Sequence, residues 1–244
     1  MPHLSVMGTL LLGFVLGLRH ALDADHLAAV ATIMGGRGGL LRSMQVGLFW
    51  GLGHALALGA VGGTLVALRI AVPERIGLLF ELAVCLMLIG LGAAALAGAF
   101  RQRMHAHRHA HDGAQHAHLH VHPLPHAVDG PEVPAHRHPQ PVAFALRPFL
   151  IGSLHGLAGT GALVLLVLTT LPTVLIGLLY VVIFGVGSVA GMGIMSVVLG
   201  APLMVASRRA AWLYGTLRAA AGLGSLLLGI VLAWRIVSGP AAGP

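Results

Sequence analysis

The chain has 244 residues, of which 57% are hydrophobic and only 9% charged, with a mean hydropathy of +0.91. Apolar runs longer than the roughly 18 residues that mark a spanning helix exclude a soluble domain and predict an integral membrane protein. The formal net charge of +7 comes from arginines that lie mostly between these runs. This placement indicates that the arginines set the topology of the chain in the membrane rather than bind nucleic acid. The single cysteine, Cys85, excludes an intramolecular disulfide.

The hydropathy pattern predicts an all-α membrane protein whose six spans cover residues 4–34, 44–70, 76–100, 145–171, 174–206 and 210–237. The first span is too long for one upright helix and contains polar groups, so we expect it to be broken or strongly tilted. This pattern divides the chain into a three-span unit over 1–100, a connector over 101–144 and a second three-span unit over 145–244.

A polar cluster interrupts the first span. On an ideal helix, His20, Asp23 and His26 fall within an arc of about 120°, whereas Asp25 points nearly the other way. Charge in hydrocarbon costs roughly 2.5 to 3.5 kcal/mol per group, so such a cluster is more often functional than a packing network. Two imidazoles and a carboxylate form a partial shell for a divalent transition metal. Asp25 joins this shell only if the helix unwinds; otherwise it pairs with Arg19 or orients a ligating histidine.

Later spans carry further polar groups in apolar, glycine-rich surroundings. His54 in the second span and His155 in the fourth are candidate ligands, although a lone histidine can also be a simple interhelical contact. Ser188 in the fifth span is a weak candidate for lining a path. Glu81 lies one turn inside the third span and is expected to reach the interface, so we do not count it as a ligand.

The two units resemble each other. The segment 17–22 aligns with 152–157, and the segment 49–54 aligns with 183–188, at offsets of 135 and 134 residues. A unit of three spans returns the chain on the opposite side of the membrane, so the second copy is inverted. In transporters with inverted repeats the substrate site lies near the midplane between the copies.

Arginine positions predict the orientation of the chain. The turns after the first, third and fifth spans are arginine-rich, whereas the opposite side has only Arg69, Arg75 and Arg235. Both termini are therefore expected outside a cytoplasmic membrane, with the connector in the cytoplasm. The arginine-rich turns contain Arg37, Arg42, Arg101, Arg103, Arg108, Arg137, Arg147, Arg208 and Arg209.

The connector is rich in histidine, alanine and proline, a composition that predicts disorder. Alternating imidazoles offer weak overlapping sites for nickel, cobalt, copper or zinc, although such tracts also arise by low-complexity drift. His3 would join an amino-terminal chelate only if Met1 were removed. The expected auxiliary metal sites are His105, His107, His109, His111, His116, His118, His120 and His122, and the tract continues with His126, His136 and His138.

The segment 19–26 resembles the R-H-A-[VF]-D-A-D-H signature of the nickel/cobalt transporter family. The segment 49–55 is similar to that family's F-x-x-G-H-S motif, with Ala55 in place of the serine. The segment 147–163 is similar to the shorter six-span members known as urease-accessory or nickel-transport proteins. Two features depart from the longer importers: their acidic L-G-x-D-T-A-T-E signature is absent, and Ser196 stands where a G-M-x-x-x-D motif has aspartate.

The resemblance implies transport of Ni²⁺, with Co²⁺ as a second substrate, and gives His20, Asp25, His26 and His54 roles in metal handling. The metal is then a transported substrate, with no resident cofactor and no enzymatic reaction. Uptake that supplies urease or hydrogenase is favoured over efflux, and cytoplasmic nickel chaperones or urease maturation proteins are the expected partners beside the lipid bilayer. A membrane-bound metal-dependent enzyme and a metal-delivery scaffold are the alternatives from other classes. The predicted ligands are His20, Asp25, His26, His54 and His155, supported by Arg19, Asp23 and Ser188.

Overall fold

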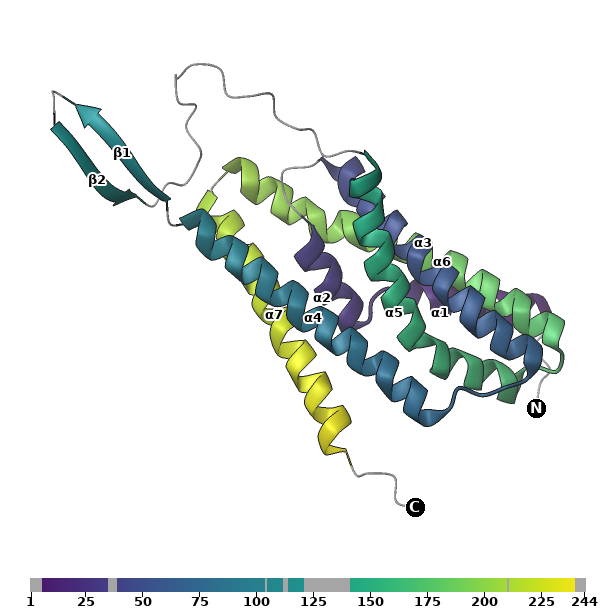
Figure 1. Cartoon of the computed structure of the whole chain (residues 1–244). Coiled ribbons are helices and arrows are strands. Elements are labelled where there is room, and N and C mark those ends of the chain that lie inside the picture. Colours follow the sequence, from purple (N-terminus) through teal and green to yellow (C-terminus); the bar gives the residue numbers. More distant parts are fainter. Residues whose placement is uncertain are drawn as a thin grey trace.

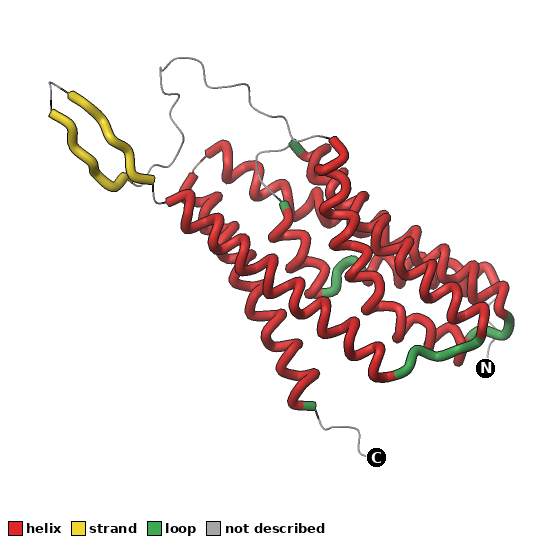
Figure 2. The backbone as a smooth tube through the Cα atoms, viewed as in Figure 1, coloured by secondary structure: helices red, strands yellow, loops and turns green. Residues whose placement is uncertain are grey.

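A computed structural model describes residues 6–34, 39–103, 105–111, 114–120, 141–209 and 211–239, with backbone alone at 101–120, 141–143, 208 and 211. Helices form nearly all of the described chain, and a small hairpin projects from one end (Figures 1 and 2). The order is α1 (Val6–His20), α2 (Ala24–Ile33), α3 (Leu40–Leu68), α4 (Glu74–Arg103), β1 (His105–His111), β2 (Ala114–His120), α5 (Pro141–Thr170), α6 (Val174–Arg209) and α7 (Ala211–Ser238).

Within the described residues, α3, α4, α5, α6 and α7 are each long and apolar enough to cross a membrane. The helices α1 and α2 pass the same test only as a pair, bent by 53° at a short break. The described chain thus has five candidate spans, or six if the bent pair counts as one. The prediction of a multi-pass helical protein with a broken first helix is confirmed.

The break has a local cause in the polar cluster. The backbone N–H groups of Leu22 and Asp23 donate to the carbonyls of Arg19 and His20, at 2.8 and 3.1 Å, which tightens the last turn of α1. Asp23 then adopts an extended backbone as the N-cap of α2, yet its carboxylate makes no cap hydrogen bond. That carboxylate accepts from the ring of His20 instead. The polar side chains that interrupt the span therefore also set where its two halves meet.

The helices form two groups, with α2 between them (Figure 1). In one group α3 packs on α5 and α6, and α6 also packs on α1; in the other, α4 packs on α7. Glycines allow close approach of helices in lipid, as at Gly187 and Gly191, which contact α1. In α3, Gly51 contacts α6, whereas nothing lies within 4 Å of a Cβ placed at Gly59.

Two apolar clusters fill the interior. One includes Met34, Trp50 and Met192, and the other includes Leu58 and Tyr180. Large apolar side chains also cover the outside of the helices. Such a surface fits a hydrocarbon environment, because in water it would be a strong aggregation site.

The described part of the connector contains two strands, and disorder of the connector as a whole stays a prediction. The strands β1 and β2 pair in antiparallel register there, which sets His105 opposite His120, His107 opposite His118 and His109 opposite His116. Alternation of histidine with other residues has the two-residue period of a strand, which explains why this stretch pairs. Residues 121–140, with the predicted site at His122, lie outside the described chain, as does His3.

Candidate metal centre

The helix break brings Asp25 to the same place as its histidine neighbours. His20 is the last residue of α1, and Asp25 and His26 lie in the first turn of α2. One carboxylate oxygen of Asp25 accepts from the backbone N–H of His26 at 2.9 Å and lies 3.0 Å from its Nδ1. On an unbroken helix Asp25 would have pointed away from His20. The bend therefore satisfies the condition under which Asp25 joins the cluster.

Two other helices complete the cluster. His155 of α5 directs Nε2 to the second carboxylate oxygen of Asp25 at 2.9 Å. His54 of α3 lies beside both halves of the broken span, with its ring centroid 5.2 Å from those of His20 and His26. The ring centroids of His26 and His155 are 4.0 Å apart. All five predicted ligand residues thus meet in one small volume, although they come from four helices.

The carboxylates determine which ring nitrogens are free. An ionised carboxylate can only accept, so Nδ1 of His26 and Nε2 of His155 carry the protons that bond Asp25. By the same argument Nδ1 of His20 donates to Asp23 at 2.8 Å. In the neutral form of each ring, these assignments leave lone pairs on Nε2 of His20, Nε2 of His26 and Nδ1 of His155. A metal-binding histidine typically donates its other ring nitrogen to a carboxylate in this way.

The freed nitrogens are buried and have no hydrogen-bond partner in the described part of the chain, and neither has either ring nitrogen of His54. His26, His54 and His155 are only 1%, 0% and 2% exposed. An unsatisfied buried polar group costs about 1–3 kcal/mol, so several in one place need a compensating ligand. Donor atoms of His20, His26 and His54 lie within 4.8 Å of one another, and so do those of Asp25, His26 and His155. The donor set fits a divalent transition metal.

The walls of the centre are aromatic. Trp50 lies with its ring centroid 5.4 Å from that of His26 and 5.8 Å from that of His155. Phe184 of α6 lies 5.5 Å from the ring of His20. These rings exclude water from one side of the cluster. The sequence offered a signal for Trp50, because it stands one helical turn before His54, but the prediction did not use it.

Comparison with known proteins identifies the family. The NicO family model, described as a high-affinity nickel-transport protein, matches residues 6–206. The chain belongs to the NicO family. The predicted resemblance to nickel transporters is therefore confirmed, and the centre described above lies wholly inside the matched region.

Curated relatives support the same assignment. The urease accessory protein UreH of Bacillus sp. (strain TB-90) is 29% identical over 209 residues, covering 86% of this chain and 83% of that protein. The high-affinity nickel transport protein of Cupriavidus necator is 34% identical over 84 residues, 32% of this chain and 23% of that protein. The hydrogenase nickel incorporation protein HupN of Bradyrhizobium diazoefficiens is 42% identical over 80 residues, 32% and 20% of the two chains. No solved structure matches this chain.

Of the three residues predicted to support the centre of this NicO protein, one bonds a histidine of the centre and two do not. Asp23 bonds His20, and its side chain is 54% exposed. Arg19 is exposed, and the carboxylate of Asp25, its predicted alternative partner, bonds histidines instead. Ser188 is buried and donates to the carbonyl of Phe184 in its own helix. The side chains of the auxiliary histidines lie outside the described positions.

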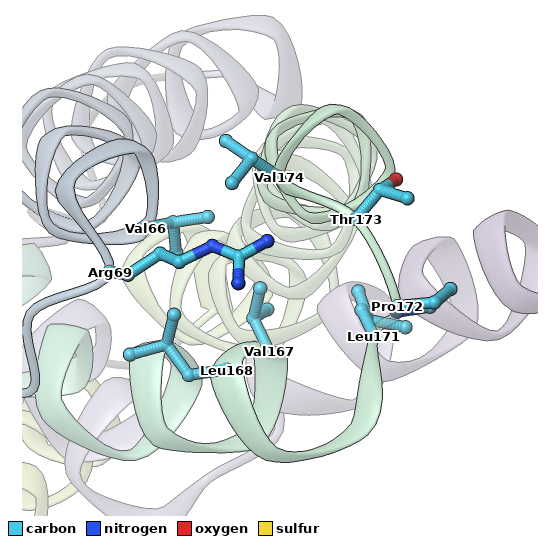
Figure 3. Close-up of a pocket in the computed structure, with 8 residues that line it drawn as sticks. All are labelled: Val66, Arg69, Val167, Leu168, Leu171, Pro172, Thr173 and Val174. Carbon is cyan, nitrogen blue, oxygen red and sulfur yellow. The ribbon is translucent and has the colours of Figure 1, made fainter.

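A small cavity lies where α3 and α5 end and α6 begins, with a volume of about 190 Å³ (Figure 3). Its walls are mainly apolar, and the guanidinium of Arg69 extends into the space between Val66, Val167 and Val174. Arg69 is the one charged residue among those that line it. A positive lining repels cations, so this cavity is not a candidate metal site.

We expect Asp25→Asn to weaken nickel binding by about 10- to 100-fold, the usual cost of losing a carboxylate that orients a ligating histidine. An amide has one acceptor oxygen, so it cannot hold His26 and His155 in their present tautomers at once. Titration calorimetry of the purified protein in detergent measures the change. The matched control is Asp23→Asn, which removes a more exposed carboxylate that holds one ring only and should cost less. Equal losses in the two variants would contradict the bridging role of Asp25.

Proposed function

We propose that this NicO protein carries Ni²⁺ into the cell, and that the ion binds at the midplane to the imidazoles of His20, His26, His54 and His155 around Asp25. Two observations carry the proposal: donor atoms of His20, His26 and His54 lie within 4.8 Å of one another, and the buried ring nitrogens opposite those held by carboxylates have no hydrogen-bond partner among the described residues. Imidazole suits nickel, and a given nitrogen site binds nickel more strongly than cobalt, so Co²⁺ is the expected second substrate.

The direction of transport is inferred from the relatives. UreH is named a urease accessory protein and HupN a hydrogenase nickel incorporation protein. Supplying nickel to enzymes made in the cytoplasm requires inward movement of the ion. By this argument the arginine-rich end of the molecule, which bears the hairpin, faces the cytoplasm. Cytoplasmic proteins that mature urease or hydrogenase would then receive the ion.

Matched backbone contacts support two inverted repeats. A Cβ at Gly17 would meet the carbonyl oxygen of Phe184, and a Cβ at Gly152 would meet that of Trp50. Gly152 follows Gly17 by 135 residues, and Phe184 follows Trp50 by 134, as in the sequence alignment. Exchanging the two units therefore turns one contact into the other.

A second pair of contacts obeys the same exchange. A Cβ at Gly187 would meet the carbonyl of Phe14, and a Cβ at Gly53 would meet the carbonyl of Phe149. The packing of whole helices obeys the exchange too. The pair α1 and α6 corresponds to the pair α5 and α3, and α4 packs on its own counterpart, α7. Two units related in this way have their shared axis between them, where transporters of this plan bind substrate.

The same alignment pairs residues of the metal centre in one unit with residues in the other. His155 is the counterpart of His20, whereas the counterpart of His54 is Ser188. Ser188 is occupied by a hydrogen bond within α6. We infer that the centre is built on the repeat axis but draws the imidazole of His54 from the first unit alone. The auxiliary histidines of the hairpin would retain the ion after release, since their backbone register sets them opposite one another.

Flux of nickel into proteoliposomes tests the proposal. We expect wild-type protein to move Ni²⁺ faster than Co²⁺, and His54→Ala to lose at least about 90% of the flux, because the variant lacks an imidazole from the nitrogen set. Deleting 105–138 should leave flux into metal-free vesicles nearly intact. If the deletion abolishes flux and His54→Ala does not, the proposed roles are reversed. Cells that express the protein should accumulate nickel; loss of nickel would instead indicate efflux.

A further inference from the structure

A large cavity opens beside the metal centre. It has a volume of about 700 Å³ and lies between α4 and α7, with α5 and the break between α1 and α2 at its inner end. His20, Asp25, His26 and His155 all line it. The cavity reaches the end of the molecule where α4 begins and α7 ends (Figure 1), so it connects the centre with the side opposite the hairpin.

One face of α4 forms a wall of this cavity. Glu74, Leu78, Glu81 and Cys85 line it, and their spacing of four, three and four residues places them on a single helical stripe. The stripe begins at the mouth with Glu74 and descends past Glu81 towards the level of Asp25. Carboxylates therefore occur at the mouth, partway down and at the inner end.

The charge of the cavity contrasts with that of the chain. The protein has a formal net charge of +7, and the described residues include four carboxylates, Asp23, Asp25, Glu74 and Glu81. Three of these line the cavity, and Asp23 bonds His20, which also lines it. Arg235 is the one basic residue among the lining side chains other than histidine. A cleft with mainly one sign of charge focuses its field and raises the local concentration of the opposite ion.

The inner end carries an independent sign of a ligand. His26 and His155 line the cavity there, are almost fully buried, and each retains a ring nitrogen without a hydrogen-bond partner among the described residues. The carboxylate stripe thus leads to unsatisfied metal-binding atoms rather than to an apolar wall.

The other side of the centre is closed by packing. Trp50, Met192 and Met34 are 1%, 0% and 5% exposed and belong to one apolar cluster. Trp50 and Met192 lie nearer than His54 and Ser188 to the arginine-rich ends of α3 and α6, and Met34 follows α2. The described structure therefore offers the ion an approach from one side only.

We propose that this cavity is the route by which hydrated Ni²⁺ reaches the metal centre, and that Glu81 holds the ion partway along it. This inference rests on the proposed function. Glu81 is exposed within the cavity and one helical turn above Cys85, so it can bind an ion that keeps most of its water. The sequence alone favoured an interfacial position for Glu81, because the helix that closes the cavity around it, α7, comes from the far end of the chain.

Kinetics of a conservative pair test the role of Glu81. We expect Glu81→Gln to raise the KM for nickel flux by about tenfold, because the charge that concentrates the ion is lost. Glu81→Asp, which keeps the negative charge, should have a KM close to that of the wild type. Equilibrium nickel binding to the purified Glu81→Gln protein should stay within about twofold of wild type, since the histidine centre is unaltered. An unchanged KM, or a loss of equilibrium binding as large as that of His54→Ala, would overturn the role of Glu81.

Thiol modification tests the route itself. In a Cys85→Ala parent, Leu78→Cys places a thiol on the cavity stripe and Leu79→Cys places one on the lipid-facing side, at side chains that are 40% and 64% exposed. A cationic, membrane-impermeant methanethiosulfonate added outside should block flux through Leu78→Cys, relative to the parent, and spare Leu79→Cys. Equal effects on both variants, or block only from the inside, would overturn the route.

The two tests separate the inference from the function on which it rests. If wild-type flux depends on His54 while Glu81→Gln and modified Leu78→Cys behave like their parents, the transport function stands and the route is wrong. If wild-type protein moves no nickel in either direction, the function itself fails.

Discussion

Replacing His26 by alanine is expected to lower nickel affinity by at least about 100-fold and to abolish measurable transport. His26 belongs to both groups of converging donor atoms, one with His20 and His54 and the other with Asp25 and His155. Its ring also takes part in holding the Asp25 carboxylate, at 3.0 Å. Among the described residues, no other single substitution removes a donor from both groups and a contact of the bridging carboxylate. Titration of purified protein and flux in proteoliposomes measure the two losses.

The control for His26→Ala is Ser225→Ala, another substitution of a fully buried polar residue. The hydroxyl of Ser225 in α7 donates to the carbonyl of Leu88 in α4 at 2.9 Å, away from the histidines. We expect this variant to lose about 1 kcal/mol of stability, leaving nickel affinity unchanged. His26→Ala must also retain its helical content and elution position. Near-normal nickel binding by a folded His26→Ala protein would refute the metal centre.

A second large effect is expected from Gly152→Ala, which should destabilise the protein by about 3 kcal/mol, the upper part of the usual range for overpacking. A Cβ at this position meets the carbonyl oxygen of Trp50 in α3, and backbone atoms cannot rotate away as a side chain can. The crossing of α3 and α5 must widen. One turn further on, Gly156 contacts the backbone of His54, so the separation of His54 from His155 should increase as well. Thermal unfolding in detergent and nickel titration report the two consequences.

Gly59→Ala is the matched control for this substitution. Gly59 is also a helical glycine, but no atom of a neighbouring element lies within 4 Å of a Cβ placed there. Alanine at this position should be neutral or stabilise by up to about 1 kcal/mol, through the better helix propensity of alanine. Gly17→Ala should behave like Gly152→Ala, because a Cβ at Gly17 would also meet a backbone carbonyl oxygen, that of Phe184. Wild-type stability and nickel affinity in Gly152→Ala would show that the two helices do not cross as closely as described.

The sequence was most informative where a pattern is local. Long apolar runs identify the candidate spans, and the excess length of the first run predicted its break. The five histidine and aspartate residues of the candidate centre were recognisable because polar groups in hydrocarbon are rare. Their assembly from four helices was nevertheless a consequence of packing, which residue spacing alone does not specify.

Other features escaped prediction because they depend on distant segments or on exact backbone geometry. The bridging of His26 and His155 by Asp25 requires the 53° bend, since an ideal helix points Asp25 away. Glu81 acquires its surroundings from α7, and Trp50 becomes a wall of the centre only when α5 crosses α3. The histidine tract was expected to be disordered on composition, yet its two-residue alternation also suits paired strands at 105–120.

The tautomers fixed by Asp23 and Asp25 have an electrical consequence. A neutral ring whose one N–H is held by a carboxylate presents a lone pair on its other nitrogen, so it has no proton to release when a metal ion binds. A divalent ion bound to such rings would cross with both of its positive charges. A membrane potential of 100 mV, negative inside, contributes about 5 kcal/mol to the inward movement of a divalent cation. With neutral imidazoles around the ion, the voltage across the membrane would suffice to drive accumulation against a concentration ratio of roughly a thousandfold.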